Sequence, residues 1–88
     1  MYVIVAYDIN NKRVNKVKAY LRTKLDWVQN SLFEGEITES KYFLILAELK
    51  KIIDEREDSI IIYKFGDKRF FERQTLGVKK AIPEETII

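Results

Sequence analysis

The sequence predicts a small α+β fold, in which two helices pack on one face of an antiparallel β-sheet. Two segments, 2–7 and 59–65, are short and rich in β-branched and aromatic residues, which is typical of buried strands. Two longer segments repeat apolar residues at the spacing of an amphipathic helix. The length of 88 residues predicts a single domain, 1–88, that is marginally stable without a partner.

The first strand and the first helix are predicted from residues 2–25. The strand at 2–7 is apolar on both faces and is followed by Asp8, and Asn10 and Asn11 supply turn and N-cap chemistry for a helix. The helix keeps its apolar residues in one narrow stripe, and bases occupy the rest of its circumference. The stripe consists of Val14, Val17, Leu21 and Leu25.

The central part of the chain predicts one strand, or a strand bent into two, and a second helix. Residues 27–33 alternate in polarity, as a strand does, and the strand continues or bends at Gly35 towards Ile37. Thr38 is the predicted N-cap of the helix, and Lys50 and Lys51 lie near its C-terminal end, where the dipole favours bases. The apolar face of this helix consists of Tyr42, Ile45, Leu46, Leu49, Ile52 and Ile53.

The last third of the chain predicts further strands. Residues 54–58 form a charged connector, 59–65 a buried strand, 70–76 a strand that ends at Gly77, and about 85–88 a short edge strand. This order corresponds to the ferredoxin-like sandwich, βαββαβ, with an additional C-terminal strand. Because a free apolar edge is a template for association, we expect the strand at 85–88 to pair with a second copy in a two-fold homodimer.

Composition excludes several classes of function. The sequence has no histidine and no cysteine, which rules out Ser-His and Cys-His nucleophile pairs and a Cys/His zinc site. Carboxylate chemistry around a hard divalent cation remains. The longest apolar run, residues 1–7, is far shorter than the roughly 20 residues of a membrane span. We therefore expect a cytoplasmic protein that does not bind a membrane.

Basic residues gather in two blocks of the sequence. Residues 12–24 carry six bases and no acid, and residues 64–80 carry six bases and two acids. An acidic block at 34–58 lies between them. This pattern favours a surface with one basic side, which would attract phosphate groups, although the solvated charged face of an ordinary domain explains it equally well.

Asp8 is the candidate metal ligand. It directly follows a buried strand and precedes a basic helix, whose N-terminus and bases attract anionic phosphate. Magnesium usually binds one or two carboxylates together with substrate phosphates, so a dimer axis near Asp8 would complete the site by adding a second carboxylate. The alternative is that Asp8 only caps the first turn of the helix, a role that Asn10 or Asn11 could also take.

Four stretches of the sequence, at their observed spacings, carry a family resemblance. They are MYVIVAYDIN at the start, KRVNKVKAYL in the first helix, VQNSLFEGEI in the centre and DSIIIY at 58–63. Together they resemble the CRISPR-associated adaptation nuclease family, the small second Cas protein that is usually encoded beside the CRISPR integrase. The resemblance covers residues 2–63, and QTLGVKK at 74–80 also fits some members.

The resemblance implies both an architecture and an activity. The protein would be a ferredoxin-like homodimer, in which the C-terminal strand completes the partner's sheet. Asp8 would be the catalytic residue and would bind Mg²⁺ together with Asp8 of the partner subunit. Family members are described as magnesium-dependent endonucleases on single-stranded RNA or on double-stranded DNA, and others serve as the central dimer of the integrase complex that inserts new spacers.

Several bases are candidate contacts to a nucleic-acid backbone. Lys12 and Lys16 belong to the first basic block, and Lys79 and Lys80 match positions that hold DNA in integrase-associated members. Arg13 matches a position that members use around the site. It lies in the first turn of the predicted helix, where a base is unfavourable unless an anion is nearby, and this favours a functional role.

Two aromatic residues, Tyr7 and Phe33, are candidate substrate contacts. Both match positions that family members use around the site. Phe33 would stack on a base of a single strand, or it is a core residue of an alternating strand, and Tyr7 has the same two interpretations. Trp27 stands where many members carry a basic residue.

Three hypotheses for the function follow from the sequence. The first is a metal-dependent endonuclease that uses a pair of Asp8 carboxylates. The second is a non-catalytic DNA-binding dimer that acts as a structural platform for the integrase. The third is a ferredoxin-like RNA-binding or ligand-sensing dimer without chemistry.

Overall fold

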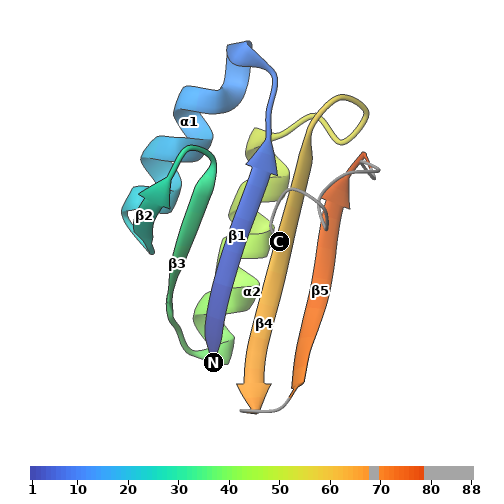
Figure 1. The fold of residues 1–88 in the computed structure, drawn as a ribbon. Helices are drawn as coiled ribbons and strands as arrows, with labels where there is room; N and C mark the ends of the chain where they lie inside the picture. The colour runs from blue at the N-terminus through green and yellow to red at the C-terminus, as the bar shows by residue number, and fades with distance from the viewer. Residues whose placement is uncertain (68–69, 79–88) are drawn as a thin grey trace.

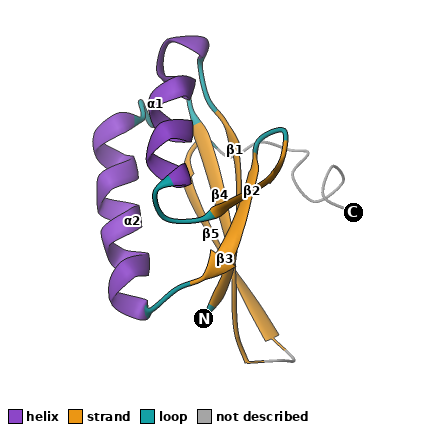
Figure 2. Ribbon diagram, turned by 90° about the vertical axis from the view of Figure 1, so that its left-hand side faces the viewer, coloured by secondary structure: helices purple, strands orange, loops and turns teal. Residues whose placement is uncertain are grey.

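The protein folds into a five-stranded antiparallel sheet with both helices on one of its faces (Figures 1 and 2). The structure is a computed structural model and describes residues 1–67 and 70–78. The strands lie in the order β2-β3-β1-β4-β5. The α+β, ferredoxin-like prediction is therefore confirmed, whereas the strand expected at about 85–88 lies outside the described residues. The elements are β1 (Tyr2–Asp8), α1 (Asn11–Arg22), β2 (Asp26–Gln29), β3 (Leu32–Glu36), α2 (Glu39–Ile52), β4 (Ser59–Asp67) and β5 (Phe70–Gly77).

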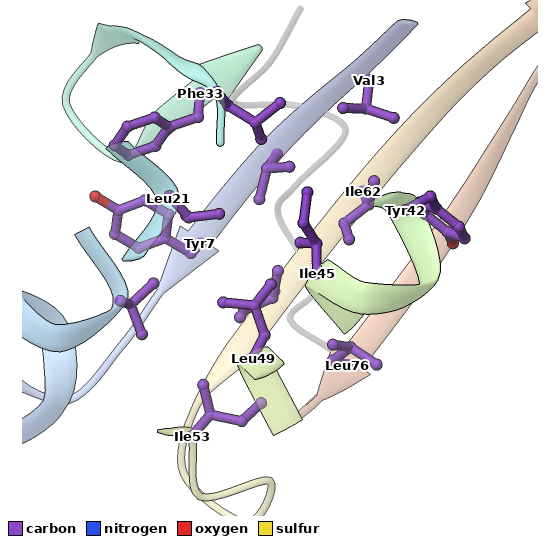
Figure 3. Packing of buried hydrophobic residues seen from close by; sticks show 14 of the residues in the cluster. Val3, Tyr7, Leu21, Phe33, Tyr42, Ile45, Leu49, Ile53, Ile62 and Leu76 are labelled. Atoms are coloured by element: carbon purple, nitrogen blue, oxygen red, sulfur yellow. The ribbon is translucent and has the colours of Figure 1, made fainter. Parts of the chain in front are cut away.

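β1 occupies the centre of the sheet, as its continuous apolar pattern predicts. It pairs with β3 on one side and with β4 on the other. Alternate residues of β1 point towards the helices, and there they are buried among apolar residues of β4, α1 and α2 (Figure 3). The residues of β1 in this core are Val3, Val5 and Tyr7.

Both helices begin at the predicted caps. The side chain of Asn10 accepts a hydrogen bond from the Lys12 amide (3.0 Å), and that of Thr38 accepts one from the Lys41 amide (3.1 Å). Each cap satisfies an amide that the first turn of a helix leaves without a partner. Ile53, predicted to belong to the second helix, follows α2 as its C-cap and is still buried in the core.

The segment predicted as one strand, or as a strand bent into two at Gly35, forms the two strands of a β-hairpin. β2 and β3 are separated only by Asn30 and Ser31, and Asn30 has a positive φ of 44°. Asparagine tolerates this conformation better than most residues, so the chain reverses at Asn30 and not at Gly35. The indole N–H of Trp27 donates a hydrogen bond to the Asn30 carbonyl (3.0 Å) and so closes the hairpin.

No described helix covers the other face of the sheet, which we call the helix-free face (Figure 2). Side chains of paired residues in neighbouring strands lie on the same face, and this relation identifies its members. In the register, Ile4 pairs with Tyr63, and Ala6 pairs with both Ile61 and Leu32. The middle of the helix-free face is apolar and contains Tyr2, Ile4, Ala6, Leu32, Ile61, Tyr63 and Phe65. By the same register, the face also carries Glu34 and Glu36 on β3 and Arg73 and Thr75 on β5.

Membrane insertion through a helix finds no support in the structure. Neither helix of the described chain has the length and the apolar character that crossing a bilayer requires.

Candidate functional site around Asp8

Asp8 is the last residue of β1, and its side chain is exposed. It pairs with Ser59 at the start of β4, so it lies at the end of the sheet where β1 finishes, β4 begins and β5 finishes (Figure 1). Because Tyr7 points towards the helices, the alternation of a strand places Asp8 on the helix-free face. A carboxylate therefore stands at one end of the apolar strip of that face.

The alternative role for Asp8 as a helix cap is wrong. Asn10 is the N-cap of α1, and its backbone carbonyl also accepts from the amides of Arg13 (2.9 Å) and Val14 (3.0 Å). The helix begins without any contribution of Asp8 to the cap.

The donor set for a metal in one chain is small. Within residues 1–67 and 70–78, no three carboxylates lie close enough together to hold an ion. A single exposed carboxylate fits magnesium, which keeps several water ligands and uses one or two carboxylates plus substrate phosphates. One chain thus supplies one of the two carboxylates of the metal site that the sequence predicts.

The residues predicted to contact a nucleic-acid backbone do not all lie on one surface of the protein. Lys12 and Lys16 are exposed and lie one turn apart on α1, so they present two positive charges on the same side of the helix. Lys79 and Lys80 lie outside the described residues. Arg13 is turned towards the protein.

The guanidinium of Arg13 binds two carboxylates of the loop between α2 and β4. Its Nε donates to Asp58 Oδ2 (2.6 Å), and its Nη2 donates to Asp58 Oδ1 (3.1 Å) and to Glu57 Oε1 (2.8 Å). These hydrogen bonds, chiefly those to Asp58, raise the pKa of Arg13. The anion that a base in the first turn of α1 requires is therefore part of the protein, and the position of Arg13 alone does not indicate a bound phosphate.

Tyr7 and Phe33 are core residues in this structure. Phe33 is 0% exposed, and its ring stacks on that of Tyr7 with 6.1 Å between the centroids (Figure 3). Burial raises the pKa of Tyr7, and the nearby charge of Arg22 opposes this shift. Of the two interpretations that the sequence left open for Phe33, the structure has the core residue, because a ring without exposed surface cannot stack on a base. Trp27, by contrast, is 53% exposed on the edge strand β2.

Sequence reasoning missed Asp58, which it placed in a charged connector. This residue is 0% exposed, and its carboxylate accepts four hydrogen bonds, two of them from Arg13. Arg13 and the amides of Asn10 and Asp54 lower the pKa of Asp58 to about 2, against the opposing effect of burial. The available signal was a base, Arg13, in the first turn of α1 without an acid in that turn, but this does not indicate which acid elsewhere in the chain is its partner.

The sequence matches a family model and several known proteins over most of its length. Residues 1–73 match the family model described as CRISPR associated protein Cas2. A protein of Pyrococcus furiosus named CRISPR-associated endoribonuclease Cas2 is 53% identical over 87 residues, which cover 99% of this chain and 100% of that protein. A protein of the same name from Methanothermobacter thermautotrophicus is 51% identical over 81 residues, covering 92% of this chain and 89% of that protein.

A solved structure is similar as well. A crystal structure described as cas2 superimposes with a TM-score of 0.73 and 43% sequence identity, over 92% of this chain and 91% of the other. The stretch matched by the family model, residues 1–73, includes β1 with Asp8, both helices and β4 with the preceding Asp58. The chain therefore belongs to the Cas2 family of CRISPR-associated proteins.

Proposed function

We propose that this protein is a magnesium-dependent endonuclease that cleaves single-stranded RNA, with Asp8 as the catalytic residue. The observation that carries the proposal is the position of Asp8, an exposed carboxylate at the end of the central strand, next to the basic helix α1. The choice of RNA rests on the relatives at 51% and 53% identity, which are named endoribonucleases.

A homodimer would complete the site. The helix-free face is apolar around Ile4 and Ala6, and a second copy packed on this face would remove that surface from water. Because Asp8 lies on the same face, a two-fold axis passing near it would bring the two Asp8 side chains together. The apolar face and the metal-binding residue thus favour the same mode of association.

Each group would have a distinct part in the reaction. When bound, magnesium would lower the pKa of a water molecule and neutralise charge on the attacked phosphate. The Asp8 carboxylates would hold the ion at the end of the sheet. Lys12 and Lys16 would bind backbone phosphates, which position a strand without reading its bases, so we expect low sequence specificity and strong salt dependence.

The test compares two variants that each replace a carboxylate by an amide. Asp8→Asn removes the charge that would hold the metal, and we expect it to reduce magnesium-dependent RNA cleavage about 100-fold or more. Glu39→Gln makes this change at an exposed carboxylate in the first turn of α2, away from the helix-free face, and should cleave as the wild type does. The measurement is a cleavage panel of RNA and DNA substrates with magnesium or with chelator. Wild-type cleavage by Asp8→Asn would overturn the proposal.

A platform for the CRISPR integrase is the second candidate, favoured by the exposed bases Lys12 and Lys16 on α1. This role needs the basic surface and the dimer but not the carboxylate of Asp8. The same two variants decide between the roles when spacer acquisition is measured in cells. Acquisition that continues in Asp8→Asn at the wild-type level identifies the platform as the cellular role.

A further inference from the structure

We infer that Asp58 is a positioning residue, which holds Asp8 in its place through the backbone on both sides of the site. The inference rests on the proposed function, because it assigns Asp58 a part in the reaction at Asp8. Asp58 would not touch the metal or the RNA. It would act through the segment that carries Asp8.

The first argument is the hydrogen bonding of the buried carboxylate. Oδ1 accepts from the Asn10 amide (2.9 Å) and from Arg13 Nη2 (3.1 Å), and Oδ2 accepts from Arg13 Nε (2.6 Å) and from the Asp54 amide (2.8 Å). One side chain therefore joins the start of α1 to the loop that follows α2. A bidentate pair between arginine and a carboxylate is both strong and fixed in direction.

The second argument is the short path from this carboxylate to Asp8. Asp8 pairs across the sheet with Ser59, which directly follows Asp58, and two residues after Asp8 the amide of Asn10 donates to the Asp58 side chain. Asp8, Ile9 and Asn10 therefore form one side of a closed ring, and Asp58 and Ser59 form the other. Ile9 is buried in the core, which anchors the middle of the first side. The segment from Asp8 to Asn10 is therefore held at both of its ends, at Asp8 by the pairing with Ser59 and at Asn10 by the hydrogen bond to Asp58.

The third argument is that Asp58 also anchors the end of β5. Its carbonyl accepts a hydrogen bond from the Val78 amide (2.9 Å), and a side chain on Gly77 would collide with the same carbonyl. The start of β4, the end of β5 and the start of α1 thus meet at one residue next to Asp8. A shift of Asp58 would be transmitted to the site, and a displacement of about 1 Å can reduce a reaction rate about 100-fold.

Asp58→Asn is the main test variant. It preserves the shape of the side chain, but its amide nitrogen cannot accept the hydrogen bonds that one carboxylate oxygen receives, so we expect the ring to open. Single-turnover RNA cleavage at saturating substrate should fall about 10- to 100-fold. The magnesium concentration for half-maximal rate should rise, while KM for RNA should stay within about twofold, since no phosphate-binding base is removed.

The matched control is Ile45→Ala, a truncation in the middle of α2 that destabilises the core away from Asp8. All cleavage assays are run well below the unfolding transitions of both variants. A merely structural role of Asp58 predicts that both variants cleave as the wild type does once folded. That result would overturn the inference.

Arg13→Lys provides a second test, which also decides the outcome if Asp58→Asn does not fold. Lysine keeps the positive charge beside Asp58 but loses the bidentate geometry. Positioning predicts a lower kcat with an unchanged KM. A higher KM with an unchanged kcat would show that Arg13 serves substrate binding, as the sequence suggested, and would overturn the positioning role.

NMR spectroscopy separates a failure of this inference from a failure of the proposed function. In the wild type and the variants, without metal, we expect the backbone amide signals of Asp8 and Ile9 to move in Asp58→Asn and to stay unchanged in Ile45→Ala. If Asp8→Asn cleaves normally, the proposed function is wrong, whatever these signals do. If Asp8→Asn is inactive but the Asp8 and Ile9 signals do not move in Asp58→Asn, the positioning role alone is wrong.

Discussion

The ion pair between Asp58 and Arg13 shows how two residues 45 positions apart determine the local structure at the site. Asp58 is fully buried, whereas the Arg13 side chain retains 21% of its exposure. A buried charge is costly unless it is paired and hydrogen-bonded, and here each carboxylate oxygen of Asp58 accepts two hydrogen bonds. Removing one partner of such a pair typically costs about 3–5 kcal/mol.

Acid should unfold the protein partly through Asp58. The pKa of this residue is about 2 in the folded protein, below the value of about 3.9 in an unfolded chain. The folded state therefore binds fewer protons, and the stabilisation, about 2–3 kcal/mol, is present above pH 4 and disappears as the pH falls through 2.

The measurement is urea unfolding between pH 2 and 6. The pKa of Asp54 is also lowered, by Arg56, so the informative quantity is the difference between the wild type and Asp58→Asn. This difference should shrink towards low pH. A constant difference over this range would show that the charge of Asp58 does not contribute.

At the scale of elements, both helices, the β2–β3 hairpin and β5 begin or end at a residue that favours the boundary. Asn10 and Thr38 begin the two helices, and Asn30 reverses the chain between β2 and β3. Gly77 ends β5 with a φ of +84°, against the carbonyl of Asp58. A residue with a side chain would be strained there and would also displace the loop before β4.

Gly77→Ala should therefore destabilise the fold, by about 1–3 kcal/mol or more. Thermal unfolding measures the effect. Gly66→Ala is the control, because a Cβ at Gly66 would meet no atom of the described residues within 4 Å and its φ is not positive. Equal loss of stability in the two variants would contradict the role assigned to the end of β5.

At the scale of the whole molecule, the sheet has two different faces. The core lies between the sheet and the helices, and the helix-free face carries apolar residues that include Ile4 and Ala6, with Asp8 at one end. Domains bury apolar faces against another layer, and a second copy would supply that layer here.

Ile4→Lys should separate the proposed dimer. A lysine on the helix-free face places a charge in the expected interface but leaves the helix-facing core intact. Sedimentation velocity should show a monomer, and RNA cleavage should fall with it. Leu44→Lys is the control, because Leu44 is exposed on α2, and it should remain dimeric. A dimer that persists in Ile4→Lys, or dissociates only in Leu44→Lys, would place the interface elsewhere.

Much of this architecture could be predicted from local sequence. The apolar run of β1, the stripes of α1 and α2, and the caps at Asn10 and Thr38 depend on neighbours within a few residues, and a linear pattern records such neighbours directly. For the same reason Asp8 could be singled out, because it follows a buried strand and precedes a helix. Here local pattern was sufficient.

The remaining features depend on contacts between distant parts of the chain. No residue near Arg13 in the sequence indicates that Asp58 is its partner. Alternation alone does not show that Phe33 is buried in the core next to Tyr7 and not exposed to a base. Register and packing set both outcomes, because they determine which face of a strand is covered and which acid a base can reach. Asp58 therefore emerged as part of the site only in the folded structure.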